Sequence, residues 1–317
     1  MKQDFSKKPI FDERMKSLLG KDFENYEKAA YERLAKSIRV NTLKISPENL
    51  RKKLEKKKWE VEQPFKEHPE IMFVKSDLEP GELGRSLEHL LGYYYIQEIS
   101  SMLPTIALNP KPNETILDLC ASPGSKTTQI AAKMENTGVI IANDLKLGRI
   151  RILASNLERC GVTNTIITKA DGIGLCKRLK EDFQIDKILL DAPCSGEGTI
   201  GTSKESTKMW NLKKINSLSK IQKNLFSSAF ELLKPGGEMV YSTCTYAPEE
   251  NEEVIDFILK KFPNIKIEKI TLPIKFRGGI TNWEDKEYVE DVKYSCRIFP
   301  QDNKTGGFFI AKFKKAL

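Results

Sequence analysis

Two cysteines lie where buried strands are expected to end. Cys194 belongs to the segment Leu190-Asp-Ala-Pro-Cys-Ser-Gly-Glu-Gly-Thr, and Cys244 belongs to Tyr241-Ser-Thr-Cys-Thr-Tyr. If the two strands are neighbours, their axes are about 4.8 Å apart, and both thiols border one cleft. Because polar turn residues flank each cysteine, a thiolate nucleophile is the chemistry that this pattern favours.

The other cysteines of the apolar segments have a simpler interpretation. A buried cysteine usually acts as a small apolar residue. We keep that interpretation for Cys160, Cys176 and Cys296. No C-x-x-C pair occurs, and the two histidines, His68 and His89, are distant from the motifs. A zinc site and histidine-based acid–base chemistry are therefore poorly supported, and we expect no metal.

A glycine-containing loop could hold a nucleotide-like cofactor. The segment Leu117-Asp-Leu-Cys-Ala-Ser-Pro-Gly-Ser-Lys-Thr leads from a predicted strand into a helix at about Ser125 and Lys126. Gly124 permits a close approach of the backbone, and the start of the helix offers free amides. A phosphate-binding P-loop fails on spacing, because Ser125 separates the glycine from the lysine. The G-x-G-x-x-G pattern is also absent, which makes a dinucleotide pyrophosphate site weak.

Two aspartates extend this cofactor pattern. Asp144 ends the second predicted strand, 20 residues after Gly124, where a carboxylate can accept both hydroxyl protons of a ribose. Asp171 follows the third strand, where a short side chain can meet an adenine amino group. Each aspartate alone would more often be an ordinary turn residue. Together, without a phosphate cradle, they suit S-adenosylmethionine.

A cysteine nucleophile next to a methyl donor implies an acceptor that is not nucleophilic by itself. Carbon 5 of a pyrimidine fits, because attack of a thiolate on carbon 6 makes carbon 5 enolate-like. Asp191 could hydrogen-bond the ring nitrogen of cytosine and stabilise the charge that develops there. Methylation of an adenine nitrogen would instead require an Asn/Asp-Pro-Pro-aromatic loop, which Asp191-Ala-Pro-Cys is not.

The elements that would position these residues form a strand–helix alternation from Asn113 onward. This pattern predicts a doubly wound, Rossmann-like α/β sheet, with ligands at the carboxyl ends of its strands. We also expect a final antiparallel strand near 308–313. The predicted strands are 115–120, 138–144, 164–168, 186–191 and 237–244, and the predicted helices are 126–134, 147–160, 215–233 and 248–261.

The first part of the chain is lysine-rich and reads as a small α+β module. Helices are predicted within 11–36 and 46–59, and strands at 37–43 and 71–74. We therefore divide the chain into an RNA-binding module, 1–88, and a catalytic domain, 89–317. The basic run at 51–58 is either a patch that faces RNA or, more often for such runs, a solvated helix face.

Composition limits the class of protein. The 317 residues include 52 Lys and Arg against 44 Asp and Glu, a net charge of +8. This excess fits a polyanionic partner such as a nucleic acid, or equally a solvated surface. The charged start lacks an apolar signal core, and no run of about 18 apolar residues occurs. We expect a cytoplasmic protein that does not enter a membrane, and a monomer.

The motifs together resemble the Sun-type RNA (cytosine-5) methyltransferases, the Nol/Nop/Sun and Fmu group. The resemblance runs from about residue 37 to the end of the chain. Weaker matches are Arg39-Val-Asn-Thr-Leu-Lys, Gly92-Tyr-Tyr-Tyr-Ile-Gln-Glu with Ser100-Ser-Met, and Arg297-Ile-Phe-Pro with Gly306-Gly-Phe-Phe-Ile-Ala. The three specific matches are Asp118-Leu-Cys-Ala-Ser-Pro-Gly-Ser-Lys-Thr, Asp191-Ala-Pro-Cys-Ser-Gly-Glu-Gly, and Ser242-Thr-Cys-Thr-Tyr followed by Glu249-Glu-Asn-Glu.

This resemblance implies a role for each site residue. Cys244 would be the nucleophile, and Cys194 would help to resolve the covalent adduct. Lys126 and Asp191 would orient and polarise the cytosine. The implied contacts to S-adenosylmethionine are Cys120, Ala121, Ser122, Pro123, Gly124, Ser125, Lys126, Asp144, Arg149, Asp171 and Asp191.

The resemblance also bears on the substrate. DNA cytosine methyltransferases take their nucleophile from the Pro-Cys loop and lack the second cysteine loop, so the Thr-Cys-Thr loop favours RNA. The compact form resembles the branch that modifies transfer RNA, with ribosomal RNA as the next candidate. Two departures are Ser122, where relatives usually carry alanine, and Gln301, where many carry histidine. The remaining alternatives are a non-catalytic RNA-binding assembly factor and a nucleotide-binding enzyme of another class.

Overall fold

The computed structural model describes residues 9–32, 34–180, 183–200 and 210–317. Within these ranges, a nine-stranded sheet has the order β11-β14-β15-β9-β8-β5-β6-β7, and β10 pairs with β15. The strands from β9 to β7 run parallel, and β15 is antiparallel to β9. The doubly wound α/β fold and its final antiparallel strand are therefore confirmed. Bounds are β5 Thr115–Asp118, β6 Val139–Asp144, β7 Thr165–Lys169, β8 Ile185–Asp191, β9 Leu233–Thr243, β10 Ile265–Glu268, β11 Arg277–Gly278, β14 Cys296–Ile298 and β15 Phe308–Lys315.

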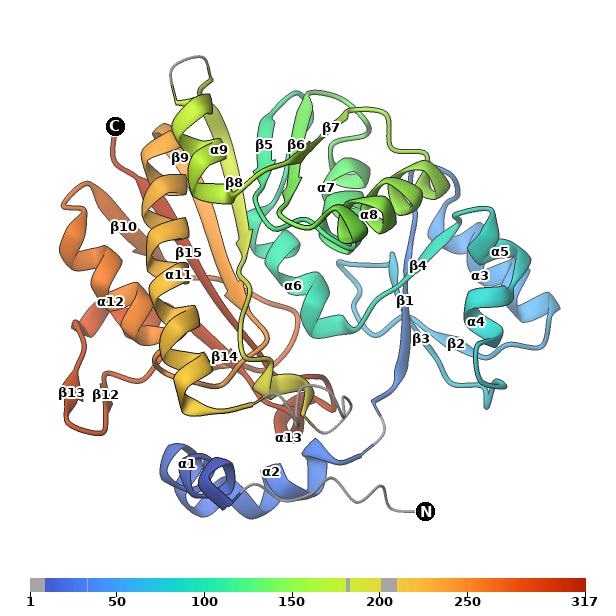
Figure 1. Ribbon diagram of the computed structural model, residues 1–317. Helices are drawn as coiled ribbons and strands as arrows, with labels where there is room; N and C mark the ends of the chain where they lie inside the picture. Colours follow the sequence, from blue (N-terminus) through green and yellow to red (C-terminus); the bar gives the residue numbers. More distant parts are fainter. Residues whose placement is uncertain (1–8, 33, 181–182, 201–209) are drawn as a thin grey trace.

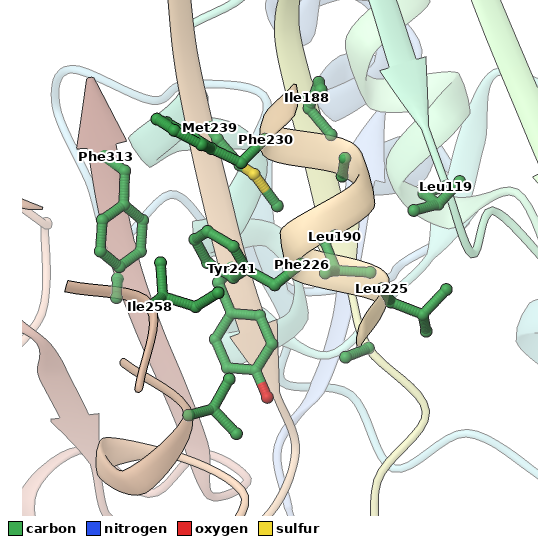
Figure 2. Close-up of a cluster of buried hydrophobic side chains, with 14 of the residues drawn as sticks. Leu119, Ile188, Leu190, Leu225, Phe226, Phe230, Met239, Tyr241, Ile258 and Phe313 are labelled. Carbon is green, nitrogen blue, oxygen red and sulfur yellow. The ribbon is translucent and has the colours of Figure 1, made fainter. Parts of the chain in front are cut away.

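Helices cover both faces of this sheet (Figure 1). Successive strand residues point to opposite faces. Ile116 accordingly packs in the cluster beneath α6 and α7, whereas Leu117 packs in the cluster beneath α9, α11 and α12. Figure 2 shows part of the second cluster, where Phe226 and Phe230 of α11 meet Met239. The helices are α6 Ile99–Leu108, α7 Ser125–Lys133, α8 Leu147–Cys160, α9 Gly172–Leu179, α11 Leu212–Leu232 and α12 Glu252–Lys261.

A second, four-stranded sheet has the order β2-β3-β1-β4 and is antiparallel. With its helices it lies on the right of Figure 1. Its fourth strand comes from beyond residue 88, so the folded unit extends past the boundary that we expected. The elements are β1 Lys36–Val40, α3 Pro47–Lys56, β2 Val61–Glu62, β3 Ile71–Val74, α4 Glu82–Arg85, α5 Leu87–Leu90 and β4 Tyr94–Ile96.

The first two helices pack on the catalytic domain rather than on this small sheet. They are α1, Pro9–Leu19, and α2, Phe23–Ala30, joined by the 3-10 turn Gly20–Asp22. The ring of Phe11 meets Trp210, and the ring of Tyr26 meets Tyr246, both with centroids 5.5 Å apart. The predicted module therefore consists of two parts, and the compact α+β unit begins near β1.

The remaining elements are short, and one prediction among the helices is wrong. The helix that we expected from residue 248 begins only at Glu252, because residues 248–251 form a turn. No described helix is long and apolar enough to cross a membrane. The short elements are η2 Glu197–Thr199, β12 Asn282–Trp283, β13 Lys286–Glu287, η3 Glu290–Tyr294 and α13 Pro300–Asn303.

The contact between the small sheet and α8 depends on a glycine. Gly92 has a φ of +72°, and a Cβ there would lie 1.9 Å from the carbonyl oxygen of Arg159. We expect Gly92→Ala to lower the free energy of unfolding by about 2 kcal/mol or more. The alanine would hold a left-handed backbone conformation, and its Cβ would clash with the carbonyl oxygen of Arg159. Chemical denaturation measures this loss.

The matched control is Gly84→Ala, because a Cβ at Gly84 meets no atom within 4 Å and its φ is not left-handed. That variant should be as stable as the wild type or slightly more stable. Equal stability of the two alanine variants would contradict the close approach at Gly92.

Candidate active site

The two cysteines lie side by side at the ends of β8 and β9. These strands pair in parallel with Asp191 opposite Ser242. Beyond that pair, the amide of Gly198 donates to the carbonyl of Cys244 at 2.9 Å, which holds the two loops together. The Sγ atoms of Cys194 and Cys244 are 3.3 Å apart, and both cysteines are free and half-buried. The expectation that the strands are neighbours is met.

The two thiols interact directly. The hydrogen bond with Cys244 and burial raise the pKa of the Cys194 thiol well above its usual value. Cys194 therefore keeps its proton at neutral pH and can donate it toward the sulfur of Cys244. This arrangement suits a pair in which one sulfur attacks while the other remains a thiol.

A partly buried ion pair lies in the same cleft. Lys126, in the first turn of α7, places its Nζ 2.6 Å from Oδ2 of Asp191 and 3.0 Å from the hydroxyl of Ser101. The other carboxylate oxygen of Asp191 accepts a hydrogen bond from Ser242 at 2.7 Å. The ring of Phe308 lies 5.5 Å from the same Nζ. The cleft thus presents a fixed cation and a fixed carboxylate next to the thiols.

A cavity of about 540 Å³ opens over these groups. This volume is typical of small-molecule sites in proteins. Gly124 has a φ of +98°, and a Cβ there would lie 2.9 Å from Leu153, so the loop can turn closely over α8 only with glycine. The predicted site residues that line the cavity are Cys120, Ala121, Ser122, Pro123, Ser125, Lys126, Asp191 and Cys244.

Four of the predicted cofactor residues lie outside that lining, namely Gly124, Asp144, Arg149 and Asp171. Asp144 ends β6, is buried, and accepts a hydrogen bond from the amide of Lys146. Nε of Arg149 lies 3.6 Å from the carboxylate of Asp144, and the same guanidinium donates to the carbonyl of Ser122. Asp171 is exposed and caps α9 by accepting from the amide of Gly174 at 2.9 Å.

Asp118 was assigned no role from the sequence, although it belongs to one of the three specific motifs. This carboxyl lines the cavity and accepts a hydrogen bond from Thr127 at 2.7 Å. Burial raises its pKa to about 7, against the opposing effects of Thr127 and Lys126. Asp118 can therefore exchange a proton near neutral pH inside the cavity.

Arg39 of β1 connects the small sheet to the cofactor loop. Its guanidinium donates to the carbonyl of Ser125 and to the hydroxyl of Thr128, both at 2.7 Å. It also bonds the side chain of Gln97, which lines the cavity. Both residues stood in weakly matched segments, but neither type nor spacing indicated this contact.

Two buried glutamates, Glu197 and Glu250, hold the cysteine loops in place through hydrogen bonds. Glu250 accepts from the amide of Ser195 at 3.0 Å and from Gln222 at 2.8 Å. Glu197 accepts from the hydroxyl of Thr245 at 3.0 Å. Each glutamate therefore ties one cysteine loop to another element, and Glu197 and Thr245 link the two loops directly.

No cluster of three or more His, Cys, Asp or Glu side chains in the described part of the chain is placed to hold a metal ion. The polar side-chain groups that line the cavity are hydroxyls, carboxylates, thiols, the amide of Gln97 and the ammonium of Lys126. Among the described atoms, the buried hydroxyl of Ser122 has no hydrogen-bond partner. It lies in the cofactor loop, where a polar ligand would satisfy it.

The chain matches two protein families over most of its length. Residues 105–314 match the family described as 16S rRNA methyltransferase RsmB/F. Residues 9–99 match the N-terminal domain of 16S rRNA methyltransferase RsmF.

Individual relatives agree with these matches. The chain is 44% identical to a tRNA (cytosine(49)-C(5))-methyltransferase of Pyrococcus abyssi over 93% of this chain and 92% of that protein. It is 40% identical to ribosomal RNA small subunit methyltransferase F of Vibrio campbellii over 93% of this chain. It spans only 60% of the length of that second relative.

Solved structures show the same fold. A methyltransferase homolog protein from Pyrococcus horikoshii matches with a TM-score of 0.86 and 36% identity, over 98% of this chain and 96% of that one. NSun6 from the same organism, crystallised with SFG, matches with a TM-score of 0.81 and 26% identity over 98% of both chains.

The pKa of Glu250 makes stability depend on pH. Burial raises this pKa from 4.5 to about 7, so between these values the folded state binds more protons than the unfolded state. The stability present at low pH is therefore lost as pH rises through 7. Relative to Glu250→Gln, which is neutral at every pH, the wild type should lose on the order of 3 kcal/mol between pH 5 and 8.

Urea unfolding at several pH values measures this difference. Glu287→Gln removes an exposed carboxylate and serves as the control, which should follow the wild type. Parallel pH profiles for the wild type and Glu250→Gln would show that the carboxyl is ionised throughout.

Proposed function

The chain belongs to the RsmB/F family of methyltransferases, and from this premise we propose that it methylates carbon 5 of a cytosine in transfer RNA. S-adenosylmethionine-dependent methylation of cytosine in RNA is the activity of the family. The relative that this chain matches over nearly the whole of both proteins is named for transfer RNA, which supports that substrate.

One observation carries the chemical part of the proposal. The sulfurs of Cys194 and Cys244 are 3.3 Å apart, and the ion pair of Lys126 and Asp191 lines the same cavity as Cys244 and the cofactor loop. A nucleophile, a second thiol, a cation and a carboxylate therefore meet where a base and a methyl donor could be held together.

The cavity residues fit S-adenosylmethionine. A buried acid ends β6 at Asp144, the buried hydroxyl of Ser122 has no hydrogen-bond partner among the described atoms, and α7 begins at the loop. A related structure holds SFG, an analogue of this cofactor. When bound, S-adenosylmethionine supplies an electrophilic methyl group. Asp144 would hold its ribose, and the loop from Cys120 to Lys126 would enclose it.

The chain's own residues would act in a fixed order. The thiolate of Cys244 attacks carbon 6 of the cytosine, and the electron pair of the 5,6 double bond moves toward carbon 5 and the ring. A protonated Asp191 carboxyl donates a hydrogen bond to the ring nitrogen, and Lys126 balances the charge that develops. Carbon 5 takes the methyl group. A base then removes the proton from carbon 5, the double bond reforms, and the bond to Cys244 breaks.

Cys194 would act in the last stage, because its thiol touches the sulfur that must leave. The adduct is released only when carbon 5 loses its proton. Removal of Cys194 should therefore block release more than attack.

Ribosomal RNA is the second candidate substrate, since the family and several relatives are named for it. The expected cytoplasmic location and monomeric state remain predictions. The RNA-binding role of the N-terminal module is likewise part of this proposal.

Asp144→Ala tests the cofactor assignment. A carboxylate that bonds both ribose hydroxyls contributes on the order of 1.5–3 kcal/mol, so its loss should weaken S-adenosylhomocysteine binding about tenfold or more. Calorimetry measures the affinity, and circular dichroism checks the fold. Asp77→Ala, at an exposed loop position, should bind as the wild type does. An unchanged affinity for Asp144→Ala would reject the assignment.

Substitutions of the two cysteines test the division of labour. Cys194→Ala should accumulate a covalent protein–RNA adduct, because attack proceeds while release is slowed. Cys244→Ala should form no adduct and transfer no methyl group, and the double variant should also form none. A denaturing gel detects the adduct as a shifted band.

The buried Cys296→Ala serves as the control and should methylate without trapping RNA. If Cys244→Ala trapped RNA and Cys194→Ala did not, the roles would be reversed. If both single variants methylated normally, the thiols would be structural.

A further inference from the structure

A second pocket lies between the small N-terminal sheet and the catalytic domain. Its volume is about 470 Å³. Phe65 and Phe73 line it from the loop after β2 and from β3, and Leu272 and Ile274 line it from the loop after β10. The pocket therefore requires both parts of the chain, a place where ligand sites are common.

This pocket is next to the active cavity, and two short segments, 98–99 and 305–306, separate the two. Ile99 and Thr305 line the second pocket, while their chain neighbours Glu98 and Gly306 line the active cavity. The amide of Gly306 donates to the carboxylate of Glu98 at 3.1 Å, and this hydrogen bond joins the two segments. The two pockets are therefore lined by consecutive residues at these two places in the chain.

The lining of the pocket is mainly aromatic and apolar. Its polar side chains Asp302 and Asn303 already have partners within the protein. The rings of Phe65 and Phe73 are half-buried. The side chain of Asn303 exchanges hydrogen bonds with the backbone of Lys275 at 2.9 and 2.7 Å. Asp302 is paired with Arg277. The pocket thus offers ring faces and apolar side chains rather than a set of directional donors.

Cations lie around the mouth. Lys275 lines the pocket, and the exposed Lys66 and Lys304 are chain neighbours of the lining residues Phe65, Asn303 and Thr305. Among the described lining residues, Asp302 is the one carboxylate, and it is paired with Arg277, which also contacts Asp22. The rim is therefore complementary to a phosphate backbone.

We propose that this pocket holds the base of a nucleotide next to the target cytosine, stacked on Phe65, while the rim lysines meet the adjoining phosphates. The inference rests on the proposed function, because it takes RNA as the occupant of the neighbouring cavity. A base that is methylated inside a cavity must leave its stack, and its neighbours then lose a stacking partner. Aromatic side chains replace such partners for any base, since every base has a π-face.

Substitutions at Phe65 test this assignment in the full chain. Phe65 lies in a loop but packs against the buried cluster that contains Ile71 of β3 and Ile99, so thermal unfolding must show that each variant keeps the wild-type stability. Phe65→Ala and Phe65→Leu should raise the KM for RNA about fivefold or more, the equivalent of about 1 kcal/mol of lost stacking, with kcat little changed. Phe65→Tyr keeps a ring face and should stay within about twofold of the wild type.

The substrate for these assays is total small RNA from cells that lack the enzyme, with labelled S-adenosylmethionine. Affinity for S-adenosylhomocysteine should be the same in all variants. Phe257→Ala, an exposed aromatic of α12, is the matched control and should leave KM unchanged. A Phe65→Leu variant with the same KM for RNA as the wild type would overturn the inference. An apolar side chain without a ring face would then be enough for RNA binding. A parallel loss of cofactor affinity would also overturn it.

A binding assay separates this inference from the proposed function. The probe is a single-stranded RNA with one cytosine flanked on both sides by 2-aminopurine, whose fluorescence falls when the base stacks. The wild type and Phe65→Tyr should quench it, whereas Phe65→Ala and Phe65→Leu should not. Equal quenching by all four proteins would reject the inference even if methylation occurs. Selective quenching would support it even if methylation fails.

Discussion

The register between β8 and β9 is the constraint on which the site depends. Parallel pairing places Asp191 opposite Ser242, so the two following loops leave the sheet side by side. A shift of one residue would turn Asp191 to the other face and separate the thiols. Because β5 is the other neighbour of β8, the loop after β5 brings Lys126 to the same point. The distance between the sulfurs and the position of the ion pair are thus two consequences of one strand order.

The residues before the catalytic domain act on this site from two sides. On one side, Arg39 of β1 fixes the start of α7 and contacts Gln97. On the other side, Arg14 of α1 donates to both carboxylate oxygens of Glu249, in the turn that follows the Cys244 loop. The N-terminal segment therefore supports both the cofactor loop and the nucleophile loop, in addition to any contact with RNA.

Short motifs with a direct chemical meaning were predictable from the sequence. The strand-end cysteines, the glycine loop and the parallel strands follow from local patterns, and the structure brings Cys194, Cys244, Lys126 and Asp191 together. Long-range contacts were not predictable. The pairing of Arg39 with the start of α7 joins residues 86 positions apart, and no local pattern encodes it. The late start of α12 has a similar cause, since Glu250 serves the Cys194 loop instead of a helical turn.

The central claim is that Cys244 forms the covalent bond to the base inside this cleft. An RNA substrate that carries 5-fluorocytosine at the target position tests it, because fluorine cannot leave carbon 5 as a proton does, and the methylated adduct is trapped on the unaltered enzyme. Protease digestion followed by mass spectrometry then identifies the modified peptide. The account predicts that the methylated fluorocytidine is attached to the peptide containing Cys244. Attachment to the peptide containing Cys194, or no attachment under conditions where cytosine is methylated, would contradict it.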